Sequence, residues 1–243
     1  MLFNSYIFIL AFFPMCLIGY FGLNHLGRHT LAQAFLLGMS LWFYGYFNPS
    51  YLAIILLSIV ANYSFTQLMG ITQNQRLKKA EMLLAVLLNL SVLFYFKYFD
   101  FFLMNMNRLF HTDFTLYNIL LPLGISFFTF QTMSYIIDLY RGEVETEHNY
   151  FTYLTYVSMF PQLVAGPIVR FSDINAELHE RQLKRSEIET GLLRFMQGLF
   201  KKVLIANQVG ALWEELRILE ASQISVTTAW LGAACFTLQL YFD

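Results

Sequence analysis

The chain has 243 residues, of which 57% are hydrophobic and 13% charged, and its mean hydropathy is +0.52. Soluble domains carry nearer ~25% charged residues, so the composition argues for a membrane protein. The formal net charge of −1 provides no basic field that would recruit nucleic acid. Cys16 and Cys235 lie inside apolar runs and are expected to be free packing residues, with no metal ligands spaced around them.

The apolar residues fall in runs of roughly 20, the length at which a helix crosses ~30 Å of hydrocarbon. The runs are too long, and alternate too little, for the strands of a membrane barrel. The sequence therefore predicts an all-α fold, a polytopic transmembrane helical bundle forming one membrane domain over residues 1–243. The predicted spans are 2–23, 31–47, 51–71, 82–103, 119–140, 191–213 and 226–242, with 151–169 as a re-entrant segment.

Lysine and arginine near the ends of the spans indicate the orientation. The loop after the third run carries Arg76, Lys78 and Lys79, and placing it in the cytoplasm puts the N-terminus outside. Strict alternation would then push the basic residues at 170–185 outside as well. The conflict disappears if 151–169 enters the membrane and returns to the same side.

Such a turn would break in the segment FPQLVAGPIVR, residues 160–170. Pro161 and Pro167 cannot continue a regular helix, and Gly166 loosens the chain. Non-helical backbone at membrane depth persists only where protein or a water-filled cavity satisfies its polar groups. The segment is therefore predicted to line a cavity inside the bundle. The alternative is a plain proline kink in a crossing helix.

Polar residues share one helical face within residues 121–143, where Gln131, Tyr135 and Asp138 align. They are either glue between helices or one wall of a polar passage. Arg141 is a possible i,i+3 partner of Asp138.

Two further groups of charges fall in or near apolar runs. Lys201 and Lys202 either extend to the interface or form a basic wall for an anionic donor. Lys97 and Asp100 are expected to form a structural pair. None of the five histidines has a metal-ligand spacing, and no nucleophile elbow, phosphate loop or dinucleotide motif occurs. The residues alone therefore offer no catalytic group.

Four stretches, in order over about residues 119–243, carry a resemblance to a known family: LPLGISFFTFQTMSYIIDLYRGEVE, NYFTYLTYVSMFPQLVAGPIVRFSDI, RFMQGLFKKVLIANQVG and LGAACFTLQLYFD. Together they resemble the membrane-bound O-acyltransferase family, and most closely its bacterial branch of alginate O-acetylation proteins. The resemblance implies a bundle with a tunnel, in which activated acyl groups from one face reach a hydroxyl acceptor at the other. The residues that it implies for the tunnel or its supporting shell are Gln131, Tyr135, Asp138, Arg141, Pro161, Gln162, Gly166, Pro167, Arg170, Lys201 and Lys202.

The family's catalytic histidine lies in an Arg-Arg-Trp-His type motif, downstream of a Phe-Ser-Gly-Tyr-Ser-Asp type stretch. None of the histidines here matches that motif, and the chain ends where the second stretch would begin. The chain is therefore expected to be the N-terminal half of a larger enzyme and inactive alone. In an intact member the histidine would act as general base on the acceptor hydroxyl.

The resemblance implies a multi-pass protein of the bacterial inner membrane that moves acetyl groups for O-acetylation of an exported polysaccharide such as alginate. The alternative is a non-enzymatic scaffold or acyl-passage component of a polysaccharide-modification complex. The expected partners are an activated acyl donor, a polysaccharide acceptor or a periplasmic acetyltransferase, and membrane lipid. No nucleic acid, metal or cofactor is expected. A secondary transporter would be expected to contain paired repeats with matching broken helices, and the sequence contains a single broken segment.

Overall fold

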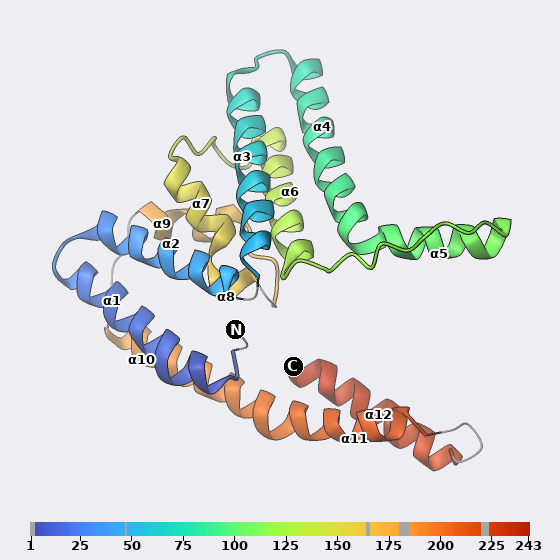
Figure 1. Cartoon of the computed structure of the whole chain (residues 1–243). Coiled ribbons are helices and arrows are strands. Elements are labelled where there is room, and N and C mark those ends of the chain that lie inside the picture. Colours follow the sequence, from blue (N-terminus) through green and yellow to red (C-terminus); the bar gives the residue numbers. More distant parts are fainter. Residues whose placement is uncertain (1–2, 47, 164–165, 180–184, 220–223) are drawn as a thin grey trace. The chain divides into compact units, whose positions relative to one another are not determined.

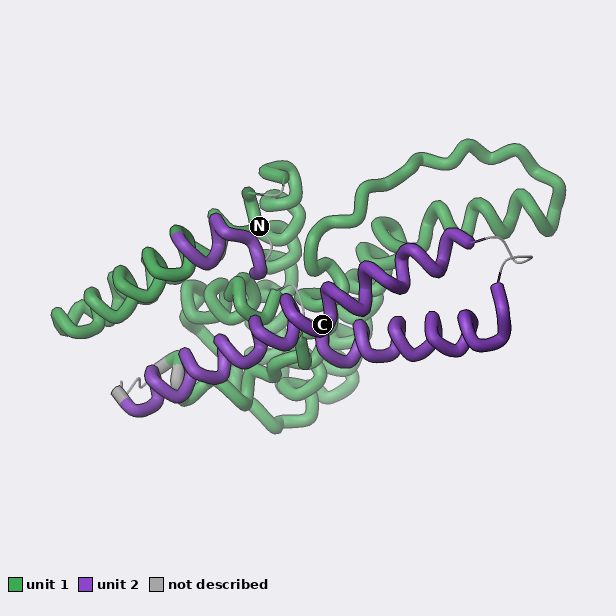
Figure 2. Tube along the Cα trace, turned by 90° about the horizontal axis from the view of Figure 1, so that it is seen from below, with its two compact units in different colours: residues 1, 11–181 green, residues 2–10, 182–243 purple. Residues whose placement is uncertain are grey.

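The computed structural model describes residues 3–46, 48–163, 166–179, 185–219 and 224–243, and gives only the backbone of Glu177, His179 and Arg185. These described residues form helices and connecting segments without any strand, which confirms the predicted all-α class. The chain divides into two compact units (Figure 2). The first comprises residues 1 and 11–181, and the second comprises residues 2–10 and 182–243.

The first unit has three central helices, α3, α4 and α6, each of which packs on the other two (Figure 1). A pair of helices, α1 and α2, joins them through the contact of α2 with α3, and α7 and α8 pack against α2 and α6. Its helices are α1 (Phe13–His25), α2 (His29–Gly45), α3 (Pro49–Ile71), α4 (Gln75–Leu93), α5 (Phe99–Phe110), α6 (Ile125–Arg141), α7 (Tyr150–Ser158), α8 (Phe160–Leu163) and α9 (Phe171–His179).

Side-chain caps set the starts of three of these helices. Asn48, Asn74 and Asn149 each accept a hydrogen bond from the backbone N–H two residues on, at 2.9, 2.9 and 3.0 Å. Such a cap satisfies one of the N–H groups that the first helical turn leaves unpaired. The polar connections therefore fix where α3, α4 and α7 begin.

Helix α6 begins at Ile125, later than the predicted span 119–140. Pro122 disfavours helical backbone in the residue before it. Gly124 has φ +67°, a left-handed value that glycine adopts without strain. Residues 111–122 are accordingly non-helical. The limits predicted at residues 2 and 47 lie outside the described part of the chain.

The predicted span 82–103 is also divided. The helix that starts as α4 passes through a π-helical segment, Phe94–Tyr98, and α5 then turns sharply away from α4 (Figure 1). A π-helical turn is a common cause of such a kink. The expected pairing of Lys97 with Asp100 is wrong. The Lys97 ammonium instead donates to the Ser126 hydroxyl at 3.3 Å, and Asp100 bonds the backbone after α5.

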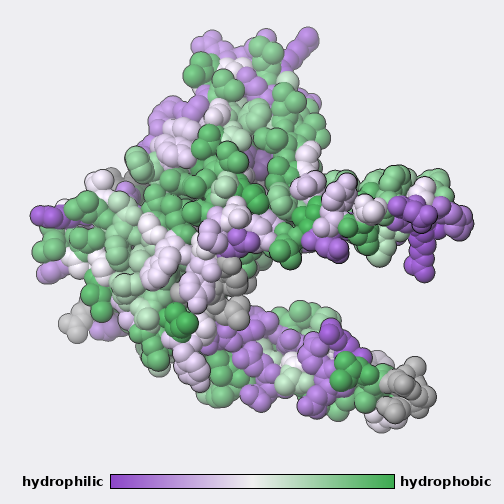
Figure 3. Space-filling model, viewed as in Figure 1, coloured by the Kyte–Doolittle hydropathy of each residue, from purple (hydrophilic) through white to green (hydrophobic). Residues whose placement is uncertain are grey.

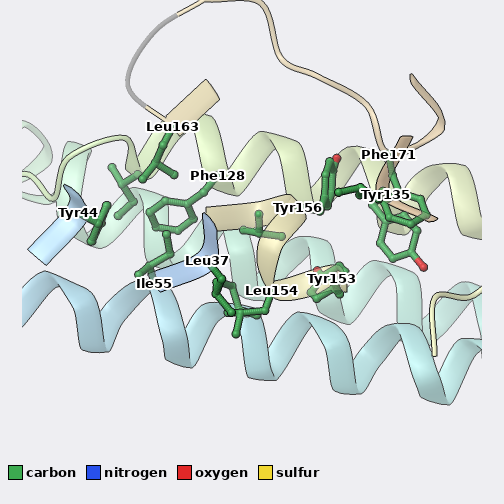
Figure 4. Packing of buried hydrophobic residues seen from close by; sticks show 14 of the residues in the cluster. Leu37, Tyr44, Ile55, Phe128, Tyr135, Tyr153, Leu154, Tyr156, Leu163 and Phe171 are labelled. Carbon is green, nitrogen blue, oxygen red and sulfur yellow. The ribbon is translucent and has the colours of Figure 1, made fainter. Parts of the chain in front are cut away.

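The core of the first unit is rich in aromatic residues. Tyr44, Tyr135, Tyr153 and Tyr156 are among its largest fully buried side chains. Figure 4 shows Tyr135, Tyr153, Tyr156 and Phe171 gathered at one end of the cluster, and Tyr44 at the other. The tyrosine hydroxyls bring polar groups into this core, and the buried ones need hydrogen-bond partners.

The second unit consists of one long helical run that folds back on a shorter helix. The run comprises α10 (Arg185–Phe200), the π-helical segment Lys201–Ala206 and α11 (Asn207–Arg217), and the shorter helix is α12 (Val226–Phe242). Helices α11 and α12 pack with the rings of Trp213 and Phe236 5.2 Å apart. Gly210 allows the Gln239 side chain to lie close to the backbone of α11.

Three helical runs in the described residues are long and apolar enough to cross a membrane, namely Phe8–His25, which includes the π-helical Phe8–Phe12, Pro49–Ile71 and Gln75–Phe110. Helix α12 is apolar but shorter. Hydrophobic residues cover much of the visible surface of α3 and α4 (Figure 3). Large apolar side chains that face outward all along helices of spanning length indicate a membrane protein.

Candidate functional site

Four of the predicted site residues lie on α6. Gln131, Tyr135 and Asp138 are buried, and their spacing of four and three residues places them on one face of the helix. Arg141 lies at the exposed end of α6 and forms an ion pair with Glu143, with 3.6 Å between Nη1 and Oε1. Among the described residues no ion pair joins Arg141 to Asp138, its possible i,i+3 partner.

The segment between α7 and α9 is broken, as the sequence predicted. Helix α7 ends at Ser158, and a single helical turn, α8, follows. Gly166 has φ +111°, a conformation that favours glycine. The predicted site residues at this break are Pro161, Gln162, Gly166, Pro167 and Arg170; Gln162 is half-buried and the others are exposed.

The broken segment forms a hairpin along α6. Just before α7, the Glu147 backbone N–H donates to the Tyr135 hydroxyl at 2.8 Å. After α7, the Leu163 carbonyl lies so close to Gly124 that a Cβ there would be 2.1 Å from its oxygen. The chain then returns, and the Phe171 ring packs on Tyr135 with 4.8 Å between centroids. Figure 4 shows Leu163 and Phe171 at opposite ends of the cluster.

The length of the hairpin can be given along the axis of α6. Gly124 and Tyr135 are eleven positions apart on α6, which corresponds to roughly 16 Å at ~1.5 Å per residue. Both ends of the hairpin lie at the level of Tyr135, and its turn reaches the level of Gly124. The depth is about half of a ~30 Å hydrocarbon layer.

The two glutamines of the predicted site meet at one carbonyl group. The Gln131 amide Nε2 donates to the Tyr156 carbonyl at 3.0 Å, and the Gln162 Nε2 donates to the same oxygen. Tyr156 lies in the last turn of α7, whose carbonyls have no partner within the helix. Its hydroxyl donates to the Val169 carbonyl at 3.1 Å, across the hairpin. Side chains therefore satisfy backbone groups that the break leaves unpaired.

Asp138 lies near the open end of the hairpin. Its side chain is almost fully buried and has no hydrogen bond or ion pair within the described residues. Among the charges that act on it, Arg170 on the returning arm of the hairpin is the strongest. The arrangement therefore places an acidic residue of the predicted site within the electrostatic influence of a basic one.

Lys201 and Lys202 belong to the second unit and lie in its π-helical segment. Lys201 is exposed, whereas the Lys202 ammonium contacts the Asp243 carboxylate of the same unit. The ion pair offsets one of the two positive charges expected to form a basic wall. The structure thus brings Gln131 and Gln162 together at one carbonyl and leaves Arg141 at the exposed end of α6. The two lysines belong to the other unit.

Comparison with curated proteins gives matches along the whole chain, although no family model matches it. The chain is 36% identical over 249 residues to the "Probable alginate O-acetylase AlgI" of Pseudomonas aeruginosa, and 35% identical to the protein of that name in Azotobacter vinelandii. It is 34% identical over 271 residues to the "Peptidoglycan O-acetyltransferase" of Helicobacter pylori. In each case the whole chain is aligned.

The chain is a homologue of these O-acetylases. The relationship confirms the resemblance to bacterial alginate O-acetylation proteins. The chain spans about half the length of the curated relatives that it matches, at 46%, 48% and 51% of the three.

One polar cluster was missed by sequence reasoning. Asn62 on α3 and Asn89 on α4 are buried and exchange amide hydrogen bonds of 3.1 and 2.6 Å. The Thr132 hydroxyl on α6 lies 3.3 Å from the Asn89 oxygen. Amide side chains within apolar runs often bond across membrane helices, and that composition was the available signal. The cluster joins the three helices next to the site.

Proposed function

We propose that the chain is part of a membrane O-acyltransferase that acetylates an exported polysaccharide. The observation that carries this proposal is the identity of 34–36% to O-acetylation proteins along the entire chain. The names of these relatives mention alginate and peptidoglycan, so the acceptor is a hydroxyl of a carbohydrate polymer or of a carrier protein that serves it. An activated acyl donor supplies the acetyl group, and the bacterial inner membrane holds the protein as a multi-pass bundle.

The hairpin of α7 and α8 forms part of the wall of the acyl passage in this proposal. Backbone that is not helical is tolerated inside a membrane only where protein or a water-filled cavity satisfies it. Gln131 and Gln162 supply such satisfaction at the Tyr156 carbonyl. The return of the chain to the level of Tyr135 supports a segment that enters and leaves the membrane on the same side.

The proposed chemistry needs a base that removes a proton from the acceptor hydroxyl, whose oxygen then attacks the acyl carbonyl. Preorganised donors would stabilise the negative charge on that carbonyl oxygen. The histidines with described side chains, His25, His29, His111 and His148, are exposed, and none carries the family's motif. We therefore assign the base to a part of the protein outside residues 1–243, and the residues here to binding and support.

Two near-isosteric variants test this assignment. Gln131→Leu and Gln162→Leu each remove one donor from the Tyr156 carbonyl, a loss of about 1 kcal/mol per hydrogen bond. If this loss of stability lowers the population of the active hairpin conformation, O-acetylation decreases roughly fivefold. The measurement is the O-acetyl content of the exported polysaccharide in cells that carry each variant as their sole copy, normalised to the protein in the membrane.

Gln73→Leu is the matched control, because Gln73 is exposed in the connection between α3 and α4. It should leave acetylation unchanged. Wild-type acetylation in both hairpin variants would contradict the role of the hairpin. Acyl transfer by the purified 243-residue chain, reconstituted with an acetyl donor and a polysaccharide, would contradict the location of the base.

A further inference from the structure

Helix α5 and the extended segment 111–121 form a projection of the first unit, here called the arm. The arm projects from the three central helices after the π-helical segment that follows α4, and its extended segment runs back along α5 to α6 (Figure 1). Its direction differs sharply from that of α3 and α4, the helices of spanning length next to it. If α3 and α4 cross a membrane, the arm therefore runs along the membrane surface.

Polar side chains of α5 hold the extended segment in place. The Asp100 carboxylate accepts hydrogen bonds from the backbone N–H groups of Tyr117 and Ile119, both at 2.9 Å. The Asn107 amide bonds both the N–H and the carbonyl of Phe114, at 2.9 and 2.7 Å. Bonds to a charged acceptor are roughly twice as strong as neutral ones. The arm is thus an ordered structure in which hydrogen bonds hold the extended segment against α5.

The face of α5 away from these clamps carries large, partly exposed apolar side chains, with Asn105 beside them and the Phe102 ring packed on Phe94 at 5.8 Å between centroids. Helical spacing places Phe102 and Leu109 together, about 140–180° from Asp100 and Asn107. Leu109 is 72% exposed and Phe102 46% exposed. Figure 3 shows hydrophobic residues along the edge of the arm on the side of α4, and hydrophilic residues at its tip. The hydrophobic surface thus lies on the side where the spanning helices run.

The backbone of the arm sets a limit on its depth. Apart from the groups bonded by Asp100 and Asn107, the peptide groups of residues 111–121 have no protein partner among the described residues. Lipid-exposed irregular backbone does not occur in the hydrocarbon region, because each unpaired group there costs several kcal/mol. These groups need water within reach. The arm therefore cannot lie deep in the membrane, although one of its faces is strongly apolar.

We propose that the arm is an interfacial anchor whose partner is the lipid surface at the end of α4. Its Phe102–Leu109 face rests on the acyl chains next to the headgroups, while Arg108 and the extended segment remain in contact with water. Amphipathic helices of this type lie roughly 5–10 Å into the boundary between headgroups and acyl chains. The anchor fixes the level of the non-helical segment that leads into Gly124 and the turn of the hairpin.

The features of the arm favour lipid over a protein as the occupant of this face. The apolar surface continues through the Phe94 ring, 5.8 Å from that of Phe102, to the outward-facing surface of α4, where Leu87 and Leu90 are exposed. Large aromatic side chains are concentrated where α4 turns into α5, in the segment FYFKYFDFF, as is typical of the membrane–water interface.

Spin-label depth measurements can test the proposal. Single cysteines replace Val60, Leu109 or Arg108 in the protein reconstituted in vesicles of phosphatidylethanolamine and phosphatidylglycerol, with the buried Cys16 and Cys235 changed to Ala. Each nitroxide is then exposed to oxygen, which enters lipid, and to a water-soluble nickel complex. Val60 is an exposed residue in the middle of α3 and serves as the marker for the membrane interior.

We expect the Val60→Cys label roughly 15 Å deep, near the centre of the hydrocarbon. The Leu109→Cys label should lie roughly 5–10 Å deep, and the Arg108→Cys label should be accessible to nickel. A Leu109→Cys label in water, one as deep as that at Val60, or one shielded from both reagents would each overturn the anchor. If the Val60→Cys label lies outside lipid, α3 does not cross the membrane, and the anchor proposal is refuted as well.

Discussion

Two isosteric substitutions in the buried tyrosine cluster should have opposite effects on stability. Tyr135 and Tyr153 are both fully buried, with ring centroids 5.5 Å apart. The Tyr135 hydroxyl accepts from the Glu147 N–H at 2.8 Å and lies 3.4 Å from the Glu145 carbonyl. The Tyr153 hydroxyl has no hydrogen-bond partner in the part of the chain that the structure describes. Tyr135→Phe therefore removes the acceptor of a buried N–H group, whereas Tyr153→Phe removes a hydroxyl that bonds none of the described residues.

The magnitudes follow from these contacts. Leaving a buried N–H unsatisfied costs about 1–3 kcal/mol, although side-chain hydrogen bonds in membrane bundles average nearer 0.6 kcal/mol. Tyr135→Phe should thus lower the free energy of unfolding by about 1 kcal/mol or more. Tyr153→Phe should leave it unchanged or raise it, because both substitutions keep the ring and its packing.

The assay is reversible unfolding in mixed micelles with increasing sodium dodecyl sulfate, followed by circular dichroism. The double variant belongs in the series, because residues in contact need not act additively. Equal losses in the two single variants, or a larger loss in Tyr153→Phe, would refute the reasoning. Such a result would mean that the Tyr153 hydroxyl has a partner, for example an ordered water.

Two other substitutions test contacts between helices. Asn62→Leu or Asn89→Leu alone should lower the free energy of unfolding by about 1–3 kcal/mol, because each breaks both hydrogen bonds between the two amides; the double variant should lose less than the sum, measured in the same micelles. Gly124→Ala should be far more destabilising than Gly142→Ala. Both glycines have positive φ, at +67° and +77°, but only at Gly124 would the new Cβ meet another atom, the Leu163 carbonyl oxygen at 2.1 Å. Similar unfolding midpoints for the two alanine variants would rule out the close contact with α8.

The sequence could predict the break in the chain because its causes are local. Pro161, Gly166 and Pro167 act on the backbone at their own positions, whatever surrounds them. The one-faced stripe of Gln131, Tyr135 and Asp138 was also predictable, since it depends only on helical spacing. The stripe's role in pairing backbone groups was not, because the Tyr156 carbonyl becomes a neighbour of Gln131 only when α7 packs on α6.

The features that were missed depend on tertiary contacts or on small shifts of helix ends. Asn62 and Asn89 are 27 residues apart, and nothing local indicates that they face one another. Asp100 and Lys97 lie within one turn, yet tertiary partners separate them, since Asp100 bonds backbone groups 17 and 19 residues on. A pairing rule based on sequence spacing alone could not anticipate those competitors.

The hairpin and the arm show how unpaired backbone limits the depth of a broken segment. At the hairpin, buried side chains from α6 and from the segment itself pair the carbonyl groups of Tyr156 and Val169. That pairing allows irregular chain to lie inside a bundle. In the arm, the side chains of Asp100 and Asn107 reach the backbone of only three residues of the extended segment. The rest needs water, so a segment with an equally apolar surface has to stay at the boundary. The pairing of peptide groups, rather than hydropathy, therefore distinguishes the hairpin inside the bundle from the arm at the membrane boundary.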